Sequence, residues 1–301
     1  MKILITGATG LVGSAIVNHC LAKKYTVHFL TTSRTKIVNQ DNYKGFYWNP
    51  TSKEIDAKCL DGVHTIINLA GASISKRWTA SHKKEMLDSR VNSVALLYKL
   101  LSENNHNVSH IISASALGIY PSSLHKKYEE DSNEVSTSFL GEVVHKWENE
   151  VDTLRALDLK ISKVRIGIVL SKNGGALTAM LKPIKLGAGA TLGTGNQFQS
   201  WVHIEDLAAL FVFIAEKKLA GVFNGVASNP VTNKVMTSTI AKQLKKPLWL
   251  PKVPTFVLQL ILGEMAALVL ESQYLQNDKI KKQGFQFTYE TIEEALQECL
   301  N

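Results

Sequence analysis

The sequence predicts an α/β fold, in which a parallel β-sheet carries helices on both faces and is joined to a smaller, mainly C-terminal domain. Two observations indicate this class. As far as Arg165, short apolar and β-branched runs alternate with segments of helical spacing, which is the pattern of βαβ units. A glycine-rich stretch then interrupts the alternation, and mainly helical segments follow it.

The strands are expected where β-branched and apolar residues form short runs between turn residues. In chain order, these runs are Lys2–Thr6, Thr26–Thr31, His64–Leu69, Ser109–Ser113, Lys160–Val164 and Val222–Asn224. Helices are expected where apolar residues recur every three or four positions. These segments are Leu11–Lys23, Met86–Leu101, Phe139–Leu157, Asp206–Glu216, Lys234–Leu244, Pro254–Leu270 and Tyr289–Leu300.

The stretch from Gly174 to about Gln199 is expected to be rich in loops, because it is punctuated by glycines at positions 174, 175, 187, 189, 193 and 195. We therefore divide the chain into two domains. The sheet domain comprises residues 1–170 and 198–228, and the smaller domain comprises residues 171–197 and 229–301.

The composition indicates a soluble globular protein. Hydrophobic residues make up 45% of the 301 residues and charged residues 20%, which excludes a disordered or collagen-like chain. The three cysteines lie far apart, so neither a disulfide framework nor a metal site is expected. The longest apolar stretch, Phe256–Leu270, contains Glu264 and is shorter than the ~20 residues of a membrane span. The sequence therefore predicts a cytoplasmic protein.

The formal net charge of +8 suggests an anionic partner. No run of Lys or Arg exceeds two residues and no nucleic-acid-binding motif occurs, so nucleic acid is not expected. The charge fits either solvated surface side chains or attraction of an anionic small ligand. We expect a small-molecule substrate, no membrane partner, and a monomer or homodimer.

The segment Gly7-Ala8-Thr9-Gly10-Leu11-Val12-Gly13 is a GxxGxxG motif between the first strand and the first helix. Glycine lets the backbone turn sharply and approach a pyrophosphate closely, while the helix N-terminus offers free N–H groups. A glycine-rich turn without a ligand is the alternative. The position of the motif directly after a first strand favours a dinucleotide site on a Rossmann-type sheet.

The end of the second strand predicts which dinucleotide binds. NAD-binding proteins of this kind have Asp or Glu about 20 residues after the glycines, where it holds the ribose 2′-hydroxyl. This chain has Thr31-Thr32-Ser33-Arg34 there and no acidic residue before Asp41. A hydroxyl and a guanidinium bind a 2′-phosphate, which a carboxylate would repel. We therefore expect NADP(H), bound at Ser33 and Arg34, with a solvated loop arginine as the alternative.

Several stretches of the chain resemble one family. Three are similar to the extended short-chain dehydrogenase/reductases, the epimerase/dehydratase group: GATGLVG at 7–13, NLAG at 68–71 and WVHIEDLA at 201–208. Others narrow the resemblance to an atypical subgroup called epimerase family proteins: RW at 77–78, SR at 89–90, GG at 174–175, the glycine-rich 186–195 and GFQF at 284–287. The resemblance spans nearly the whole chain, and most members of the subgroup have no established substrate.

The resemblance implies cofactor contacts at matching positions. These are Gly7, Thr9, Gly10, Leu11, Val12 and Gly13 for the phosphates, Ser33 and Arg34 for the 2′-phosphate, Leu69 and Ala70 for the ribose on the nicotinamide side, Glu85 and Arg90 on the following helix, and Val169 for a backbone contact. Arg90 stands where other extended members often have asparagine, so it would bring a positive charge near the cofactor. For Glu85 and Arg90, a pair on the helix surface is the alternative.

The usual acid–base pair of the superfamily, Tyr-x-x-x-Lys, is absent. Aligning the chain on Trp147-Glu148 puts Phe139 at the tyrosine position and Val143 at the lysine position, and neither side chain can transfer a proton. No tyrosine lies between Tyr128 and Tyr274, so no other register restores the pair in that stretch.

Two other side chains are candidate catalytic proton donors, Tyr120 and Ser115. The family serine falls on Ser115 if one residue is inserted before Tyr120, and on Ala116 if none is. Tyr120 follows a strand end that normally faces the nicotinamide, although a core tyrosine is the alternative. Lys76-Arg77-Trp78 is a candidate clamp over cofactor or substrate, with a solvated loop as the alternative.

Two functions remain open at this stage. One is an NADP(H)-dependent oxidoreductase or epimerase-like enzyme that acts on an unknown small molecule without the Tyr–Lys dyad. The other is a catalytically silent NADP(H)-binding sensor or regulatory module. A sugar-nucleotide epimerase proper is disfavoured because it also uses tyrosine and lysine, and the fold alone cannot decide.

Overall fold

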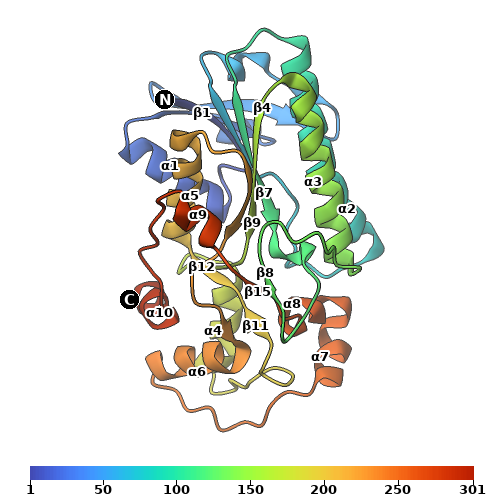
Figure 1. The fold of residues 1–301 in the computed structure, drawn as a ribbon, viewed down its shortest axis with the longest axis vertical. Helices are drawn as coiled ribbons and strands as arrows, with labels where there is room; N and C mark the ends of the chain where they lie inside the picture. The colour runs from blue at the N-terminus through green and yellow to red at the C-terminus, as the bar shows by residue number, and fades with distance from the viewer.

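A computed structural model describes all 301 residues and has a central β-sheet with helices on both faces and a small lobe at one end (Figure 1). The strands of the main sheet lie in the spatial order β13 (Gly221–Gly225), β9 (Lys160–Ile166), β7 (His110–Ala116), β6 (Thr65–Asn68), β1 (Lys2–Thr6), β2 (Thr26–Thr31), β4 (Tyr43–Asn49) and β3 (Asn39–Gln40). All these pairs are parallel except β3 on β4, and β5 (Glu54–Ile55) adds an antiparallel hairpin to β4. The predicted α/β class with a Rossmann-type parallel sheet is confirmed.

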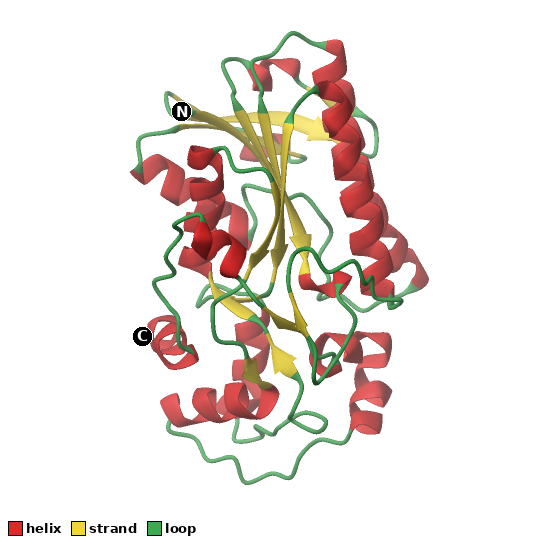
Figure 2. Ribbon diagram, in the orientation of Figure 1, coloured by secondary structure: helices red, strands yellow, loops and turns green.

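Two pairs of helices cover the sheet. Helices α1 (Leu11–Ala22) and α5 (Ile204–Lys217) pack together on one face, and α2 (Ala80–Glu103) and α3 (Phe139–Thr153) pack on the other, so that the strands lie between two helical layers (Figure 2). The starts of α2 and α3 are fixed by capping, because the Thr79 and Ser138 hydroxyls accept hydrogen bonds from the N–H groups of His82 and Gly141. Both faces of the sheet are therefore buried, as parallel sheets require.

The order of the strands reverses beside β1. The chain runs from β1 through β2 to β4 at one edge, then returns to β6 on the other side of β1 and continues through β7 and β9 to β13. At this reversal Thr6 of β1 lies opposite Asn68 of β6. Ligands of open α/β sheets bind at the carboxyl ends of the strands next to such a reversal.

The small lobe is mainly helical. Its helices are α4 (Ala176–Lys185), α6 (Asn233–Gln243), α7 (Thr255–Leu262), α8 (Ala267–Leu270) and α10 (Ile292–Leu300). Short strand pairs join it to the sheet domain: β10 (Ile168–Leu170) with β12 (Trp201–His203), β11 (Phe198–Gln199) with β14 (Val231–Thr232), and β8 (Lys127–Tyr128) with β15 (Tyr274–Leu275). A separate apolar cluster, which includes Leu177, Ile184, Met236, Ile240 and Leu296, forms its core.

The segment between β15 and α10 returns to the main sheet. It contains α9 (Asp278–Lys282), and its Ile280, Phe285 and Phe287 side chains belong to the main core. The Asp206 carboxylate then accepts hydrogen bonds from the N–H groups of the next two residues, 288 and 289. The sequence places this segment in the smaller domain, whereas its packing joins it to the sheet. The domain boundaries themselves remain a prediction.

Three of the differences between the observed elements and the sequence prediction have a clear physical cause. The strand β4 was not predicted, because Gly45 interrupts its apolar pattern. That glycine leaves room for a neighbouring ring, since a Cβ there would lie 2.5 Å from Phe29 Cζ. Helix α4 occupies part of the stretch expected to be loops, despite Pro183 within it. The helix expected over 254–270 is broken at Gly263, which has a φ of +60°.

Candidate functional site

The β1–α1 turn forms a cradle of bare backbone at the strand reversal. Gly7 has a φ of +68°, a conformation that suits glycine and few other residues. A Cβ on Gly13 would lie 2.1 Å from the carbonyl oxygen of Gly7, so strand and helix are closer than a side chain allows. Gly10 caps α1 without a side-chain hydrogen bond, and the first N–H groups of a helix have no partner within it. The cradle therefore has the donors and the helix dipole that a pyrophosphate requires.

A row of polar side chains holds the ends of the neighbouring strands together. The Thr6 hydroxyl donates to Asn68 Oδ1 (2.8 Å) and accepts from the N–H groups of Leu69 (3.0 Å) and Ala70 (3.1 Å). Asn68 Nδ2 in turn donates to the Ser113 hydroxyl at 3.2 Å. The predicted contact residues Leu69 and Ala70 are thus fixed by Thr6 and Asn68, whose roles the sequence analysis missed.

Other predicted contact residues lie directly against the cradle. A Cβ on Gly7 would lie 3.1 Å from the backbone of Leu69. A Cβ on Gly175, whose φ is +75°, would lie 3.0 Å from Leu11 Cδ2 and 3.7 Å from the carbonyl oxygen of Val169. The phosphate loop, the end of β6 and the start of α4 therefore meet at one place.

The predicted 2′-phosphate residues lie at the end of β2. The Arg34 guanidinium stacks 3.7 Å from the centre of the Tyr47 ring, and its Nη2 lies 4.0 Å from Glu54 Oε2. The Arg34 side chain is 70% exposed, so an anion can reach it. The Ser33 hydroxyl lies 2.8 Å from that of Thr35. A cavity of about 460 Å³ adjoins this place and is lined by Arg34, Tyr47, Lys53, Glu54, Ile55 and Asp56.

Arg90 holds the loop that follows β6. Its Nη1 donates to the carbonyl oxygens of Met86 (2.7 Å) and Ala72 (3.3 Å), and its guanidinium faces the Trp147 ring at 5.2 Å. Burial lowers the pKa of Arg90 to about 10. The Ser89 hydroxyl also accepts a hydrogen bond from Ala72 N–H at 2.8 Å. Arg90 is therefore engaged with backbone carbonyls, and its predicted contact with a cofactor remains a prediction.

Glu85 acts on the same loop through a histidine. His82 Nδ1 lies 2.8 Å from Glu85 Oε2, and His82 Nε2 lies 2.8 Å from the carbonyl oxygen of Ser73. Both neighbours of the ring can only accept hydrogen bonds, so both contacts form together when the ring carries two protons. Glu85 is itself more than half exposed, and its predicted contact with a cofactor also remains a prediction.

Phe139 and Val143, at which the resemblance predicts the positions of the usual dyad, have hydrocarbon side chains. Phe139 is the first residue of α3, and its ring meets Trp78 edge to face at 5.3 Å. Val143, one turn later, is buried. Lys83 Nζ lies 4.4 Å from the centre of the Phe139 ring and donates to Glu264 Oε2 at 2.6 Å. This ion pair connects α2 to the small lobe next to the ring.

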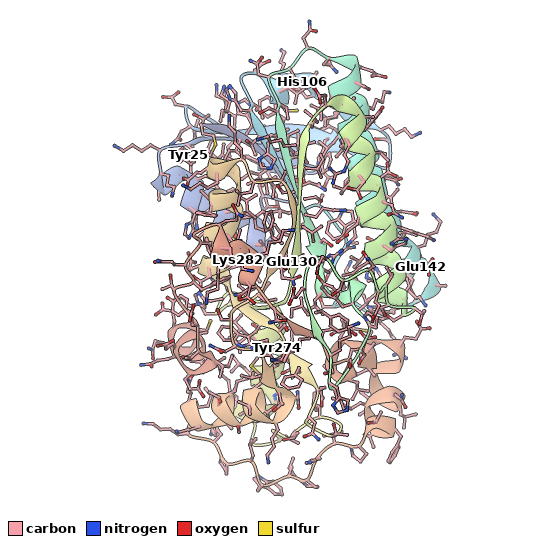
Figure 3. The ribbon with its side chains drawn as sticks, viewed as in Figure 1. Tyr25, His106, Glu130, Glu142, Tyr274 and Lys282 are labelled. Carbon is pink, nitrogen blue, oxygen red and sulfur yellow. The ribbon has the colours of Figure 1, made fainter.

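Tyr120 lies inside the protein. Its side chain is fully buried, and its hydroxyl accepts from Arg165 Nη1 (2.8 Å) and donates to Asn224 Oδ1 (2.9 Å). Burial raises the pKa of Tyr120 to about 12, although Arg165 acts in the opposite direction. Glu130, which lies near the junction of the sheet and the small lobe (Figure 3), accepts from the Asn224 N–H at 2.9 Å. Catalysis by Tyr120 remains a prediction, and this environment does not favour it.

Ser115 belongs to the same buried network. Its hydroxyl donates to Glu148 Oε1 at 2.5 Å, and Arg165 donates from Nε and Nη2 to the two oxygens of that carboxylate at 2.9 and 3.0 Å. Lys163 Nζ lies 3.6 Å from the same group. The Ser115 hydroxyl therefore has a charged partner already, and a catalytic role for it also remains a prediction.

The structure offers few alternatives for other chemistry. No three His, Cys, Asp or Glu side chains are grouped so that they could hold a metal ion. The three cysteines are free and buried, and burial raises the pKa of Cys20 and Cys59 to about 12. No helix is long and apolar enough to cross a membrane.

Comparisons with known proteins agree with this geometry. The model of the NAD dependent epimerase/dehydratase family matches residues 3–225, and a domain of unknown function, DUF1731, matches residues 253–299. An epimerase family protein of Staphylococcus aureus (strain MRSA252) is 35% identical over 301 residues, which cover 99% of this chain and 98% of that protein.

Solved structures are similar over the whole chain. The human epimerase family protein SDR39U1 (isoform 2), solved with NADPH, is 28% identical, with a TM-score of 0.86 and coverage of 99% of both chains. A nucleoside-diphosphate sugar epimerase from Corynebacterium glutamicum is 26% identical, with a TM-score of 0.80, and the match covers all of this chain and 58% of that one. The resemblance to the extended short-chain dehydrogenase/reductases is confirmed: the chain belongs to the NAD-dependent epimerase/dehydratase family of NAD(P)-binding proteins.

Proposed function

We propose that this protein binds NADP(H) in preference to NAD(H), with the 2′-phosphate at Arg34 and Ser33. The observation that carries the proposal is the exposed Arg34 guanidinium, which the Tyr47 ring supports at 3.7 Å at the end of a β2 strand that lacks an acidic residue. A guanidinium in this position forms charge-assisted hydrogen bonds with a phosphate. The NADPH in the similar human structure supports the same preference.

The rest of the dinucleotide fits the strand reversal. The Gly7–Gly13 cradle would hold the pyrophosphate on the N-terminus of α1, since Gly10 caps that helix without a side chain that would cover its first N–H groups. Leu69 and Ala70, fixed by Thr6, would line the ribose on the nicotinamide side. When bound, the nicotinamide gives or accepts a hydride at its C4 atom. The protein's part is to orient the cofactor and exclude water.

We further propose an oxidoreductase or epimerase-like reaction on a small molecule, with a proton donor other than a Tyr–Lys dyad. The ring of Phe139, which the alignment puts at the tyrosine position, packs with Trp78 and Lys83 and offers an aromatic face beside a cation in support of this proposal. The alternative is a catalytically silent NADP(H)-binding module. It is favoured by the hydrocarbon at Phe139 and Val143 and by the engaged hydroxyls of Tyr120 and Ser115.

The cofactor preference is tested first and the proposed reaction second. Calorimetric titration with NADPH, NADP⁺, NADH and NAD⁺ should give tighter binding of the phosphorylated pair, and equal affinities would refute the preference. Turnover is then measured in two ways: by the loss of NADPH absorbance with a panel of carbonyl compounds, and by chromatography of sugar nucleotides incubated with the protein and NADP⁺, because an epimerisation returns the hydride to its product and consumes no cofactor. Turnover of any member supports the enzyme, whereas tight binding with no turnover supports the silent module.

A further inference from the structure

The far end of the small lobe has an unusual charge. Residues 176–197 and 229–263 contain no Asp or Glu but seven lysines: Lys182, Lys185, Lys234, Lys242, Lys245, Lys246 and Lys252. None of these lysines takes part in an ion pair of the structure. Many lysines elsewhere are unpaired as well, since only seven of them lie within 4 Å of a carboxylate. What distinguishes these segments is that they contain no acidic residue of their own, so their lysines form a locally positive region.

The same end exposes large apolar side chains. Leu186 is 84% exposed, Trp249 71%, Phe256 69%, Leu260 84% and Ile261 65%. We call these five residues the tip patch. Single exposed apolar residues are ordinary on protein surfaces, but a group of this size on one lobe marks a site of interaction.

The members of the tip patch come from segments that lie side by side. A Cβ on Gly189 would lie 2.9 Å from Leu248, so the loop that follows Leu186 touches the segment of Trp249. Leu192 and Val253 form a parallel bridge, which continues this contact as far as the start of α7. Phe256, Leu260 and Ile261 then lie on α7 itself.

The tip patch also lies at an end of the molecule. In Figure 1 the loop between α6 and α7, which carries Lys245, Lys246 and Trp249, forms the end of the long axis opposite the N-terminus. Strand β1 and helix α1, which carry the cradle between them, lie on the main sheet, away from this loop. A large flat partner can therefore approach the tip while the cradle remains open.

We propose that the tip patch docks on the surface of an anionic lipid bilayer. The lysines of a locally positive region are drawn to anionic headgroups, and exposed Trp, Phe and Leu side chains enter the boundary between headgroups and acyl chains. A second copy of the chain would bring a second set of lysines to the same end of the lobe and is disfavoured by repulsion. A nucleic acid would engage the lysines but leave the aliphatic side chains of α7 in water. Surface docking needs no membrane span, so it is compatible with the absence of a spanning helix.

The test uses the full chain and sedimentation with vesicles. Vesicles of phosphatidylcholine mixed with phosphatidylglycerol should bind the protein, whereas vesicles of phosphatidylcholine alone should not. The Lys245→Glu/Lys246→Glu variant should lower the partition coefficient by about tenfold or more, since each lysine near an anionic surface favours binding by about fivefold. The Lys217→Glu/Lys218→Glu variant is the matched control. It also replaces two adjacent lysines by glutamates, but at the C-terminal end of α5. Lys218, like Lys245, has a positive φ.

Tryptophan emission reports on the apolar part of the contact. Trp48, Trp147 and Trp201 are buried, and Trp78 is half-buried against Phe139. A blue shift on adding anionic vesicles should therefore come mainly from the exposed Trp249 and be lost in Trp249→Phe but not in Trp78→Phe. The Phe256→Ser/Leu260→Ser variant changes exposed positions only and should fold normally, as circular dichroism would verify, but bind vesicles more weakly.

Three results would overturn the proposal. One is the absence of binding to anionic vesicles. Another is equal loss of binding in the two lysine variants, which would show long-range attraction without docking at the tip. The third is unchanged vesicle binding in Phe256→Ser/Leu260→Ser. If that variant instead abolished a dimer seen by analytical ultracentrifugation without lipid, the tip patch would be a contact between copies of the chain.

Discussion

Arg165 Nη1 donates a 2.8 Å hydrogen bond to the hydroxyl of Tyr120, so the phenol that the sequence offers as a proton donor is already the partner of a buried cation. Arg165 is in turn held by both oxygens of Glu148. The network connects strands β7, β9 and β13 to α3, because it joins Ser115, Arg165 and Asn224 to Glu148. Its side chains stabilise the fold at the carboxyl ends of these strands.

We predict that Tyr120→Phe lowers stability and leaves cofactor affinity unchanged. The change removes the hydroxyl and leaves donors and acceptors of Arg165 and Asn224 without a partner, at a cost of about 1–3 kcal/mol. Urea denaturation and NADPH titration measure the two quantities. If turnover exists and Tyr120→Phe reduces it by about 10²–10⁴-fold with stability intact, while Phe139→Ala has a much smaller effect, then Tyr120 is the donor after all.

Arg34→Ala should weaken NADP(H) binding by roughly ten- to hundredfold and leave NAD(H) binding nearly unchanged. The loss corresponds to a charge-assisted phosphate contact of about 1.5–3 kcal/mol. Arg155→Ala is the control, since it also removes one exposed positive charge but lies by the end of α3. A preference for NADP(H) that survives Arg34→Ala would mean that another group, such as Lys53 in the adjoining cavity, recognises the 2′-phosphate.

Gly13→Ala should destabilise the protein and impair dinucleotide binding together. Its Cβ would lie 2.1 Å from the Gly7 carbonyl oxygen, so α1 must move away from β1, at a cost of about 1–3 kcal/mol. Gly10→Ala is the matched change, because its Cβ would lie 3.3 Å from the same oxygen and its φ is −83°. Thermal unfolding with and without NADPH distinguishes them. Equal effects of the two substitutions would contradict the close packing described here.

Glu148 should make stability depend on acid pH. Burial acts to raise its pKa, but the hydrogen bonds and charge of Arg165 hold the pKa below the ordinary value of 4.5. A carboxyl whose pKa is lower in the folded state stabilises the protein above its unfolded pKa, and this contribution is lost as the pH falls through its folded pKa.

Glu148→Gln therefore tests the pair at two pH values. Near neutral pH it should cost about 3–5 kcal/mol, because Arg165 is left buried without its partner. The difference from the wild type should narrow below pH 4.5, where the wild-type carboxyl also becomes protonated. Urea denaturation of both proteins at each pH measures the difference between their free energies of unfolding. Glu142→Gln removes a carboxylate from an exposed pair with Lys146 and should change the free energy of unfolding little. A loss of stability comparable to that of Glu148→Gln would argue against a special role for burial.

The parts of the fold that depend on local pattern were predictable. The first two strands and the start of α1 follow from apolar runs and glycine spacing, and the structure has them at Lys2–Thr6, Thr26–Thr31 and Leu11. Strand β4 was not predictable in this way. Its Gly45 weakens the strand pattern, and the reason for the glycine is the Phe29 ring on the neighbouring strand, which only the folded sheet brings there.

The same limit applies to the candidate site. Arg34 was singled out because it follows β2 and no acid precedes Asp41. Its support by Tyr47 and its approach to Glu54 depend on the β4–β5 hairpin, and no local signal places that hairpin beside β2. The burial of Tyr120 likewise depends on partners 45 and 104 residues away in the sequence.

The return of residues 278–289 to the main sheet has a consequence for biosynthesis. Ile280, Phe285 and Phe287 fill the main core, and Asp206 at the start of α5 binds the backbone of residues 288 and 289. The regions that match two separate family models, 3–225 and 253–299, thus share one core. During translation the sheet is complete as soon as β13 has emerged, yet it keeps an uncovered apolar surface until the later segment arrives. Exchange of either region alone between relatives should therefore lower the stability of the whole chain, because each would lose its packing partner in the shared core.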